Sequence, residues 1–341
     1  MPVKKRRKKK RIRFEAIVLM FAVAALAAMT LWLLLATPAA PPSGTTPATQ
    51  PSSQPATQPQ TSSQPATQPQ TQPQTEPVTQ PVTKPVLPDA YQASAGYQQD
   101  MRTQYEAYAQ LYPELSIPTV VKYVNMGLDR PFYTNIVTVD DPDSLTVLVN
   151  KFRALPSNYK PSDLVVLKNK SRSGVQMRAD AAAAFDRMSQ AAAQEGLSIL
   201  GFSGFRSYSY QNNLYSNYCK NDPVEVVDTY SARPGHSEHQ TGLAIDVCTK
   251  DTAYNRFGTT QEYRWALEHM HEYGFIQSFP VTEIVPGSTP TVDNGQEQPV
   301  YLHGYMLEEW HFRYVGVELA TYLHENGLLL DEYYALSYGK A

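Results

Sequence analysis

A tract of Pro, Thr, Gln and Ser between residues 37 and 90 limits most strictly what this chain of 341 residues can fold into. Within it, the decapeptide SSQPATQPQT at 52–61 recurs letter for letter at 62–71. A segment of this composition cannot bury an apolar core, and its prolines favour an extended polyproline conformation. We therefore interpret it as a spacer that would reach on the order of 150 Å when extended, and we expect the folded body beyond it.

The residues before the spacer predict a membrane anchor. Residues 1–14 contain nine Lys or Arg and no acid, and residues 16–36 are apolar apart from Thr30. A helix of this length spans the hydrocarbon thickness of roughly 30 Å, and the basic flank marks the cytoplasmic side. A cleaved signal peptide is the alternative, although its apolar region is usually about 7–15 residues long. We expect an uncleaved single-pass anchor in the cell membrane, with the C-terminal part outside the cell.

The charge distribution argues against a nucleic-acid-binding protein. The net charge is −3 although nine cations lie in the N-terminal tail, so the remainder of the chain is clearly acidic. Nucleic-acid binding requires a basic surface instead. No obligate protein partner is evident from the sequence. Cys219 and Cys248 both belong to the part expected outside the cell, where either one disulfide or two free thiols is compatible with the sequence.

The sequence of the folded body predicts an α+β fold, because several helices are expected beside a few strands that do not alternate regularly with them. The spacing of apolar residues and the Gly and Pro positions predict helices at 104–116, 117–129, 177–197, 207–219, 263–275 and 317–328, and a further helix at 143–152. Strands are expected within 197–205, 241–248 and 307–316. We expect a small, mostly antiparallel sheet that is packed by these helices.

Alternation along two of these strands separates a core face from a chemical face. In GLAIDV, the apolar Leu243, Ile245 and Val247 would share the core face, whereas Asp246 would lie opposite with only small residues beside it. The second strand, EWHFRY, would turn His311 away from the core in the same way. The open space in front of Asp246 favours a site that admits a ligand.

These residues suggest a zinc site. If the two strands are neighbours, His311 would meet Asp246, and His239 would approach from the turn before the strand. Two imidazoles and one carboxylate leave the fourth tetrahedral zinc position open, which is the catalytic pattern. Glu308, three residues before His311, would serve as the base for the zinc-bound water, whereas Glu309 would point to the other face.

A structural role for the histidines is the alternative, because a single histidine is more often structural than catalytic. The HExxH signature of common metalloproteases is absent from the sequence. His303 lies close enough along the chain to be a substitute ligand.

Three motifs in order resemble the VanY-type zinc D-Ala-D-Ala carboxypeptidases and the related L,D-carboxypeptidases of bacterial cell walls. They are SGFRSYSYQ, SEHQTGLAID and EEWHFRYVG, and the resemblance covers about residues 150–320. It implies an α+β fold of the D-Ala-D-Ala-peptidase type and one Zn²⁺ per chain. The family ligands match His239, Asp246 and His311, and the general base matches Glu308.

The resemblance also implies roles for residues around the metal. Arg206 matches the arginine that polarises the scissile carbonyl, and Gln211 and Ser237 match substrate contacts. Arg233 lies near the turn, and we expect it to meet a terminal carboxylate. Many relatives carry proline at the position of Glu309, so the geometry before His311 could differ here.

The sequence thus predicts five segments and one activity. The segments are a basic cytoplasmic tail at 1–14, a transmembrane anchor at 15–36, the spacer at 37–90, a helical extension at 91–150 and a zinc carboxypeptidase domain at 151–335. The expected reaction is removal of the C-terminal D-alanine from peptidoglycan stem peptides. L,D-carboxypeptidase action on tetrapeptide stems, endopeptidase action and a non-catalytic cell-wall-binding module are the alternatives.

Overall fold

The computed structural model describes residues 89–293 and 296–337. The expected basic tail and anchor, and the spacer up to residue 88, lie outside these residues. No helix in the described part is long and apolar enough to cross a membrane. The helices are η1 (Gln99–Met101), α2 (Arg102–Leu111), α3 (Ile117–Met126), α4 (Ala179–Gln194), α5 (Tyr208–Tyr218), α6 (Val224–Tyr230), η2 (Glu238–Thr241), η3 (Tyr254–Thr259), α7 (Gln261–His269), η4 (Met270–Tyr273), α8 (Val317–Asn326) and α9 (Leu330–Ser337).

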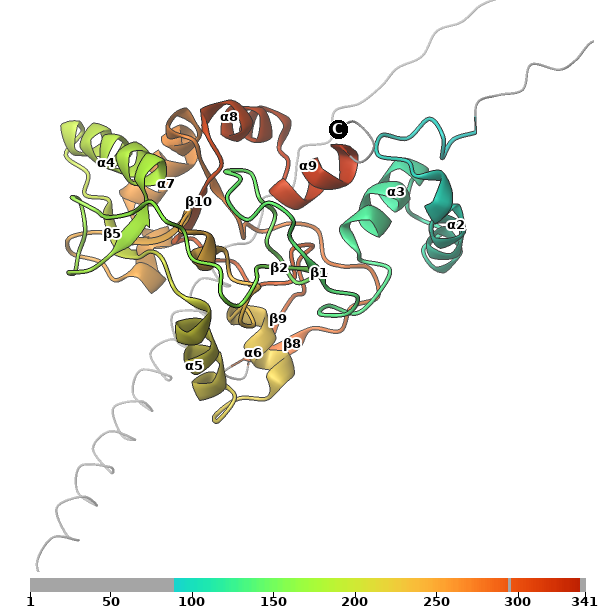
Figure 1. Ribbon diagram of the computed structural model, residues 1–341. Coiled ribbons are helices and arrows are strands. Elements are labelled where there is room, and N and C mark those ends of the chain that lie inside the picture. Colours follow the sequence, from blue (N-terminus) through green and yellow to red (C-terminus); the bar gives the residue numbers. More distant parts are fainter. Residues whose placement is uncertain (1–88, 294–295, 338–341) are drawn as a thin grey trace, which may run out of the picture. The chain divides into compact units, whose positions relative to one another are not determined.

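A four-stranded antiparallel sheet forms the centre of this α+β fold, in the order β5-β6-β10-β7. Its strands are β5 (Leu200–Ser203), β6 (Ala244–Cys248), β7 (Phe275–Gln277) and β10 (His311–Tyr314). In Figure 1, β5, β10, α4 and α7 lie together, while α5 and α6 form a separate pair below them. The sheet therefore has the small antiparallel form that the sequence predicts, and two of its central strands carry the candidate residues.

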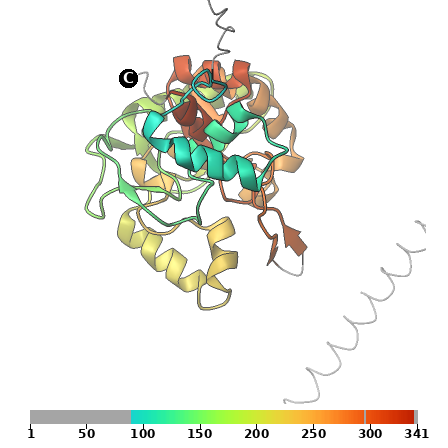
Figure 2. The ribbon, with the colours of Figure 1, turned by 90° about the vertical axis from the view of Figure 1, so that its right-hand side faces the viewer.

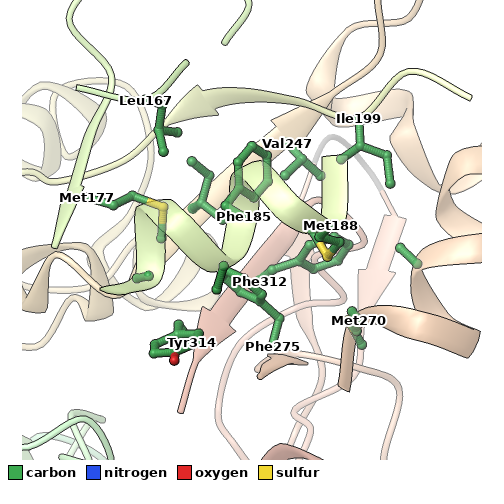
Figure 3. Packing of buried hydrophobic residues seen from close by; sticks show 14 of the residues in the cluster. Leu167, Met177, Phe185, Met188, Ile199, Val247, Met270, Phe275, Phe312 and Tyr314 are labelled. Carbon is green, nitrogen blue, oxygen red and sulfur yellow. The ribbon is translucent and has the colours of Figure 1, made fainter. Parts of the chain in front are cut away.

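Alternation places the main apolar core on one face of this sheet. Val247 of β6 and Phe312 of β10 are fully buried there, together with Phe275 of β7. Helix α4 covers this face through Phe185 and Met188 (Figure 3). The core face predicted for both strands is confirmed, which leaves Asp246 and His311 on the opposite face.

Short two-stranded pairs surround the central sheet. They are β1 (Val137–Thr138) with β2 (Arg153–Ala154), β3 (Leu164–Val166) with β4 (Gln176–Arg178), and β8 (Thr291–Asp293) with β9 (Gln296–Gln298). The β8–β9 hairpin projects from the rest of the domain (Figure 2). The sequence does not indicate these pairs or α6 and α9, because elements of two to eight residues contain too few positions for a clear periodicity.

Helices α2 and α3 confirm the two helices predicted within 104–129. The Ser116 side chain caps α3 by accepting a hydrogen bond from the Thr119 N–H, and Gly127 ends the helix with φ of 89°. Together the two helices bury a second apolar cluster that includes Tyr105 and Val120. Helix α3 packs against α9 near the C-terminus (Figure 1). The two N-terminal helices are therefore joined to the C-terminal part of the fold.

The helix predicted at 143–152 is wrong. This segment consists of turns and extended backbone between β1 and β2. Polar side chains bond locally to the backbone there: Ser144 Oγ accepts from the Thr146 N–H, and Asn150 Oδ1 accepts from the N–H groups of Phe152 and Arg153. Such bonds compete with the helical hydrogen-bond pattern.

The two cysteines are free thiols, so the disulfide that the sequence allowed is not formed. Cys248 is buried at the end of β6, and Cys219 is half-buried just after α5. A disulfide requires Cα atoms about 5.5 Å apart in a suitable orientation. Sequence spacing contains no information about that distance.

Candidate active site

The pairing of β6 with β10 brings the predicted metal ligands together. His311 lies directly opposite Asp246 in the register of the two strands. His239 enters from η2, the short helix before β6, which ends at Gly242 with φ of 69°. One ligand atom from each of the three residues lies within 4.8 Å of the other two. The three side chains are buried, and together they form a compact His–Asp–His group.

The hydrogen bonds of the two imidazole rings test whether this group fits a metal ion. His239 Nδ1 lies 2.8 Å from the carbonyl oxygen of Gly204, and His311 Nε2 lies 2.9 Å from Glu238 Oε2. Both partners are acceptors, so these nitrogens carry the protons. His239 Nε2 and His311 Nδ1 face Asp246, at 3.2 and 3.1 Å from its Oδ1, and are the ring nitrogens that would bind a metal. This arrangement of donors fits zinc.

The pKa values in the group reflect the closeness of its charges. Burial lowers the pKa of His239 to about 4, and the Arg206 guanidinium acts in the same direction. Burial also lowers the pKa of His311, but hydrogen bonds to Asp246 and Glu238 outweigh it and raise this pKa to about 10. Burial raises the pKa of Asp246, yet His239 and Arg206 hold it well below its usual range. The positive charge that faces Asp246 therefore lies on His311, whereas His239 is neutral.

His303, the possible substitute ligand, is not available to a metal. Its Nε2 lies 2.8 Å from the carbonyl oxygen of Pro280, and its Nδ1 accepts a hydrogen bond from the Tyr305 N–H. Both ring nitrogens are therefore already used within the protein.

Glu308 and Glu309 point to different parts of the structure. Glu308 lines a cleft beside the His–Asp–His group, and its Oε2 lies 3.8 Å from His311 Nδ1. Burial, together with the negative charge of Asp246, raises the pKa of Glu308 to about 7. The Glu309 carboxylate instead lies against Gly258 of η3, where it would clash with any added Cβ. Of the two acids, Glu308 alone lines the cleft, as the sequence analysis expected.

A cleft of about 330 Å³ opens beside the His–Asp–His group. Arg206 lines it, donates from Nε to Ser203 Oγ at 3.1 Å and forms an ion pair with Asp246. An aromatic wall, in which Phe202 stacks on Tyr254, forms another side. The cleft is therefore large enough for a short peptide segment next to the His–Asp–His group.

Gln211 and Ser237 both lie in this cleft. The Gln211 amide nitrogen donates to the Ala232 carbonyl at 2.8 Å, which fixes the side chain. Its Oε1 is buried and has no hydrogen-bond partner among the residues that the structure describes. A buried acceptor without a partner is costly, so this oxygen is well suited to receive an N–H group from a bound peptide.

Arg233 does not line the cleft in the described part of the chain. Its guanidinium forms two hydrogen bonds with the Asp228 carboxylate, at 3.1 and 2.8 Å, and stacks over the ring of Tyr133. This pair engages Nε and Nη2 of the guanidinium, and the expected contact with a terminal carboxylate stays a prediction.

The sequence analysis gave no role to Glu238, Arg313 or Ser278. Glu238 is buried, and its carboxylate accepts hydrogen bonds from all three side chains around it: His311, Arg313 and Ser278. Two signals were available: Glu238 precedes His239 directly, and Arg313 shares the alternation of His311. Neither signal identifies the partner, since the two residues lie 75 positions apart.

Comparisons with known proteins agree with this geometry. A family model for VanY, described as D-alanyl-D-alanine carboxypeptidase, matches residues 174–287. YodJ of Bacillus subtilis, which is named as a carboxypeptidase, is 34% identical over 205 residues, which cover 58% of this chain and 69% of YodJ. A D-alanyl-D-alanine carboxypeptidase of Enterococcus faecalis is 30% identical over 204 residues, which cover 57% and 67% of the two chains.

One solved structure extends the comparison to the fold. The LdcB LD-carboxypeptidase superposes with a TM-score of 0.52 at 32% sequence identity. The match covers 59% of this chain and 90% of LdcB.

Proposed function

Because the chain belongs to the VanY family of D-alanyl-D-alanine carboxypeptidases, we propose that it is a zinc-dependent peptidase that releases the C-terminal D-alanine from peptidoglycan stem peptides. The observation that carries this proposal is the buried group of His239, Asp246 and His311, which lies in one cleft with Glu308 and Arg206. A structural metal site would have four protein ligands and no neighbouring cleft.

The residues of the site divide the chemistry between them. His239, Asp246 and His311 would hold one zinc ion, which supplies Lewis acidity toward water and toward a carbonyl oxygen when bound. Glu308 takes the proton from the attacking water and delivers it to the leaving amine of D-alanine. Arg206 donates N–H groups to the oxygen of the scissile carbonyl, where negative charge develops during attack.

Substrate binding uses the polar groups around the cleft. Gln211 Oε1 accepts a peptide N–H, which satisfies its unpaired lone pairs. Ser237 lines the same cleft and forms a hydrogen bond with the substrate rather than acting as a nucleophile. The reaction therefore proceeds without a covalent intermediate, in contrast to that of serine enzymes.

The family and the Enterococcus faecalis relative are named for D-Ala-D-Ala, which favours a pentapeptide stem as substrate. A second candidate is L,D-carboxypeptidase action on tetrapeptide stems, and the similarity to LdcB favours it. Both reactions release one D-alanine, and they differ in the configuration of the residue before the cleaved bond. A non-catalytic wall-binding module is disfavoured because the ligand group and Glu308 are all in place.

The test is release of D-alanine from the two stem peptides. The full chain is incubated with a pentapeptide and, separately, with a tetrapeptide, and the shortened product is identified by mass. We expect release from the pentapeptide, loss of that release after chelation and recovery on addition of zinc. Preferential cleavage of the tetrapeptide would select the L,D reaction. Undiminished activity in metal-free protein, or no release from either peptide, would refute the proposal.

We also propose that the enzyme acts outside the cell and is held at the membrane by the apolar segment at 15–36. The support is the sequence pattern of nine cations before that segment and the spacer at 37–90 after it. Such an arrangement suits a polymeric substrate that does not diffuse. Protease added to cells without a wall should remove the catalytic domain, while the N-terminal tail stays protected. Recovery of the whole chain in the soluble fraction would refute the anchor.

A further inference from the structure

We propose that Glu238 is a positioning residue that sets the orientation and tautomer of His311 and links it to the segment carrying His239. The inference rests on the proposed function, because it assigns this role with respect to the zinc site. Glu238 lines the cleft as well, but in this role it acts on the metal through the His311 imidazole and does not bind the metal itself.

The His311 ring lies between two carboxylates. Its Nδ1 faces Asp246 Oδ1 at 3.1 Å, and its Nε2 faces Glu238 Oε2 at 2.9 Å. An ionised carboxylate can only accept a hydrogen bond, so Glu238 requires the proton to be on Nε2. Nδ1, on the side where His239 and Asp246 lie, is then the nitrogen that would bind zinc. Without Glu238, either tautomer could form.

Glu238 is itself held in place. Oε2 also accepts a hydrogen bond from Ser278 Oγ at 2.6 Å, and Oε1 accepts one from Arg313 Nη1 at 3.1 Å. The carboxylate is 6% exposed and Arg313 is not exposed at all. A buried charge pair of this kind has few alternative arrangements, so the His311 partner cannot move freely.

Arg313 connects the Glu238 carboxylate to the backbone. Its Nη2 donates to the carbonyls of Leu145 and Val147 at 3.1 and 2.9 Å, and its Nε donates to the Tyr314 carbonyl at 3.0 Å. The carbonyls of the 143–152 segment can serve as acceptors because they are not used in a helix. The segment that the sequence misassigned therefore has a part in supporting the site.

Glu238 connects the two elements that carry the histidine ligands. Glu238 and His239 are neighbours on η2, whereas His311 and Arg313 share one face of β10. The Glu238 carboxylate thus joins the two elements that supply the imidazole ligands. A metal site assembled from separate segments needs such a link, since its ligand distances depend on how the segments are placed.

An amide cannot replace this carboxylate. Glu238 accepts at both oxygens, from His311 and Ser278 on one side and from Arg313 on the other. In Glu238→Gln, the NH₂ group would face either Arg313 or the His311–Ser278 pair, donor against donor. The substitution changes almost no volume, so its effect reports on hydrogen bonding.

The experiment measures zinc affinity and the His311 tautomer in the full chain. Competition with a chromophoric chelator gives the zinc dissociation constant, and ¹⁵N NMR of the zinc-loaded protein reports which ring nitrogen of His311 carries the proton. We expect Glu238→Gln to bind zinc 10- to 100-fold more weakly and to shift His311 away from the Nε2–H form. Ser278→Ala, which removes one of the bonds that hold the carboxylate, should weaken zinc binding less and retain the fold.

Glu332→Gln is the matched control. Glu332 is also 6% exposed and pairs with Lys122, but it lies in α9 away from the zinc group. This variant should lose stability while its zinc affinity stays at the wild-type value. Wild-type affinity and an unchanged tautomer in both Glu238→Gln and Ser278→Ala would overturn the inference. Failure of the wild-type protein to bind zinc would instead contradict the proposed function.

Discussion

The buried side chain of Lys151 should make the free energy of unfolding depend on pH. Its side chain is 2% exposed, and its Nζ donates to the Asp228 carbonyl at 2.5 Å. The ammonium lies 3.8 Å from the ring centroid of Tyr305 and 4.8 Å from that of Tyr133. Burial lowers its pKa from 10.5 to about 7, and Arg233 acts in the same direction against the opposing charge of Asp228.

The sign of the resulting pH dependence follows from this pKa. Below pH 7 the amine is protonated in both the folded and the unfolded chain, and the fold bears the whole cost of the buried charge. Between pH 7 and 10.5 the unfolded chain binds more protons, so the free energy of unfolding rises with pH. The shift to about 7 corresponds to a cost of about 5 kcal/mol at pH 6, which falls to about 2 kcal/mol at pH 9.

The perturbation is Lys151→Met, which keeps a long apolar side chain but removes the charge. The free energy of unfolding is measured by urea titration from pH 6 to 9 for both proteins. We expect the difference between Lys151→Met and wild type to fall by about 3 kcal/mol over this range, in favour of the wild type at the higher pH. The absolute difference also contains lost hydrogen bonds, whereas its pH dependence reports the buried amine.

A matched control is Lys168→Met, since Lys168 is exposed. Its curve should stay parallel to that of the wild type. A Lys151→Met difference that is constant from pH 6 to 9, whatever its sign, would refute the reasoning.

Three further predictions concern the site and the thiols. Glu308→Ala should retain zinc binding but lose several orders of magnitude in turnover, and Glu309→Ala should be mild. The reverse order in a D-alanine release assay would contradict the roles assigned to these two acids. Denatured, unreduced protein should show two reactive thiols per chain, from Cys219 and Cys248, and an absence of thiols in the titration would indicate a disulfide. Benzylpenicillin should neither inhibit nor label the protein, because we assign Ser237 to hydrogen bonding with the substrate and not to nucleophilic attack. A penicilloyl adduct seen by mass spectrometry would contradict this assignment.

The periodicity of single elements could be predicted from the sequence. The helix predicted at 177–197 is observed as α4, at Ala179–Gln194, because an alanine-rich run with regularly spaced apolar residues favours a helix by itself. The two faces of β6 and β10 were also predictable, since side chains alternate strictly along a strand. Once these faces were known, the chemistry of His239, Asp246 and His311 suggested a common site before any contact was known.

Local reasoning failed where distant groups decide the conformation. Segment 143–152 contains enough apolar residues for a helix, but its carbonyls bind Arg313, which lies about 170 positions later in the chain. The same reasoning found Glu308 from its spacing to His311, yet it missed Glu238 beside His239. The role of Glu238, which lies on η2, depends on His311 and Arg313 of β10, and the neighbours of Glu238 in the sequence do not reveal these contacts.

The sequence by itself therefore determined which residue types are available and which face of each element they occupy. Only the tertiary structure decided that β10 pairs with β6, that Arg313 and Glu238 form a buried pair behind the zinc group, and that Lys151 is enclosed. The physical reason is the range of the interactions. Propensity and alternation act between residues a few positions apart, whereas burial and charge pairing depend on segments that meet only when the chain has folded.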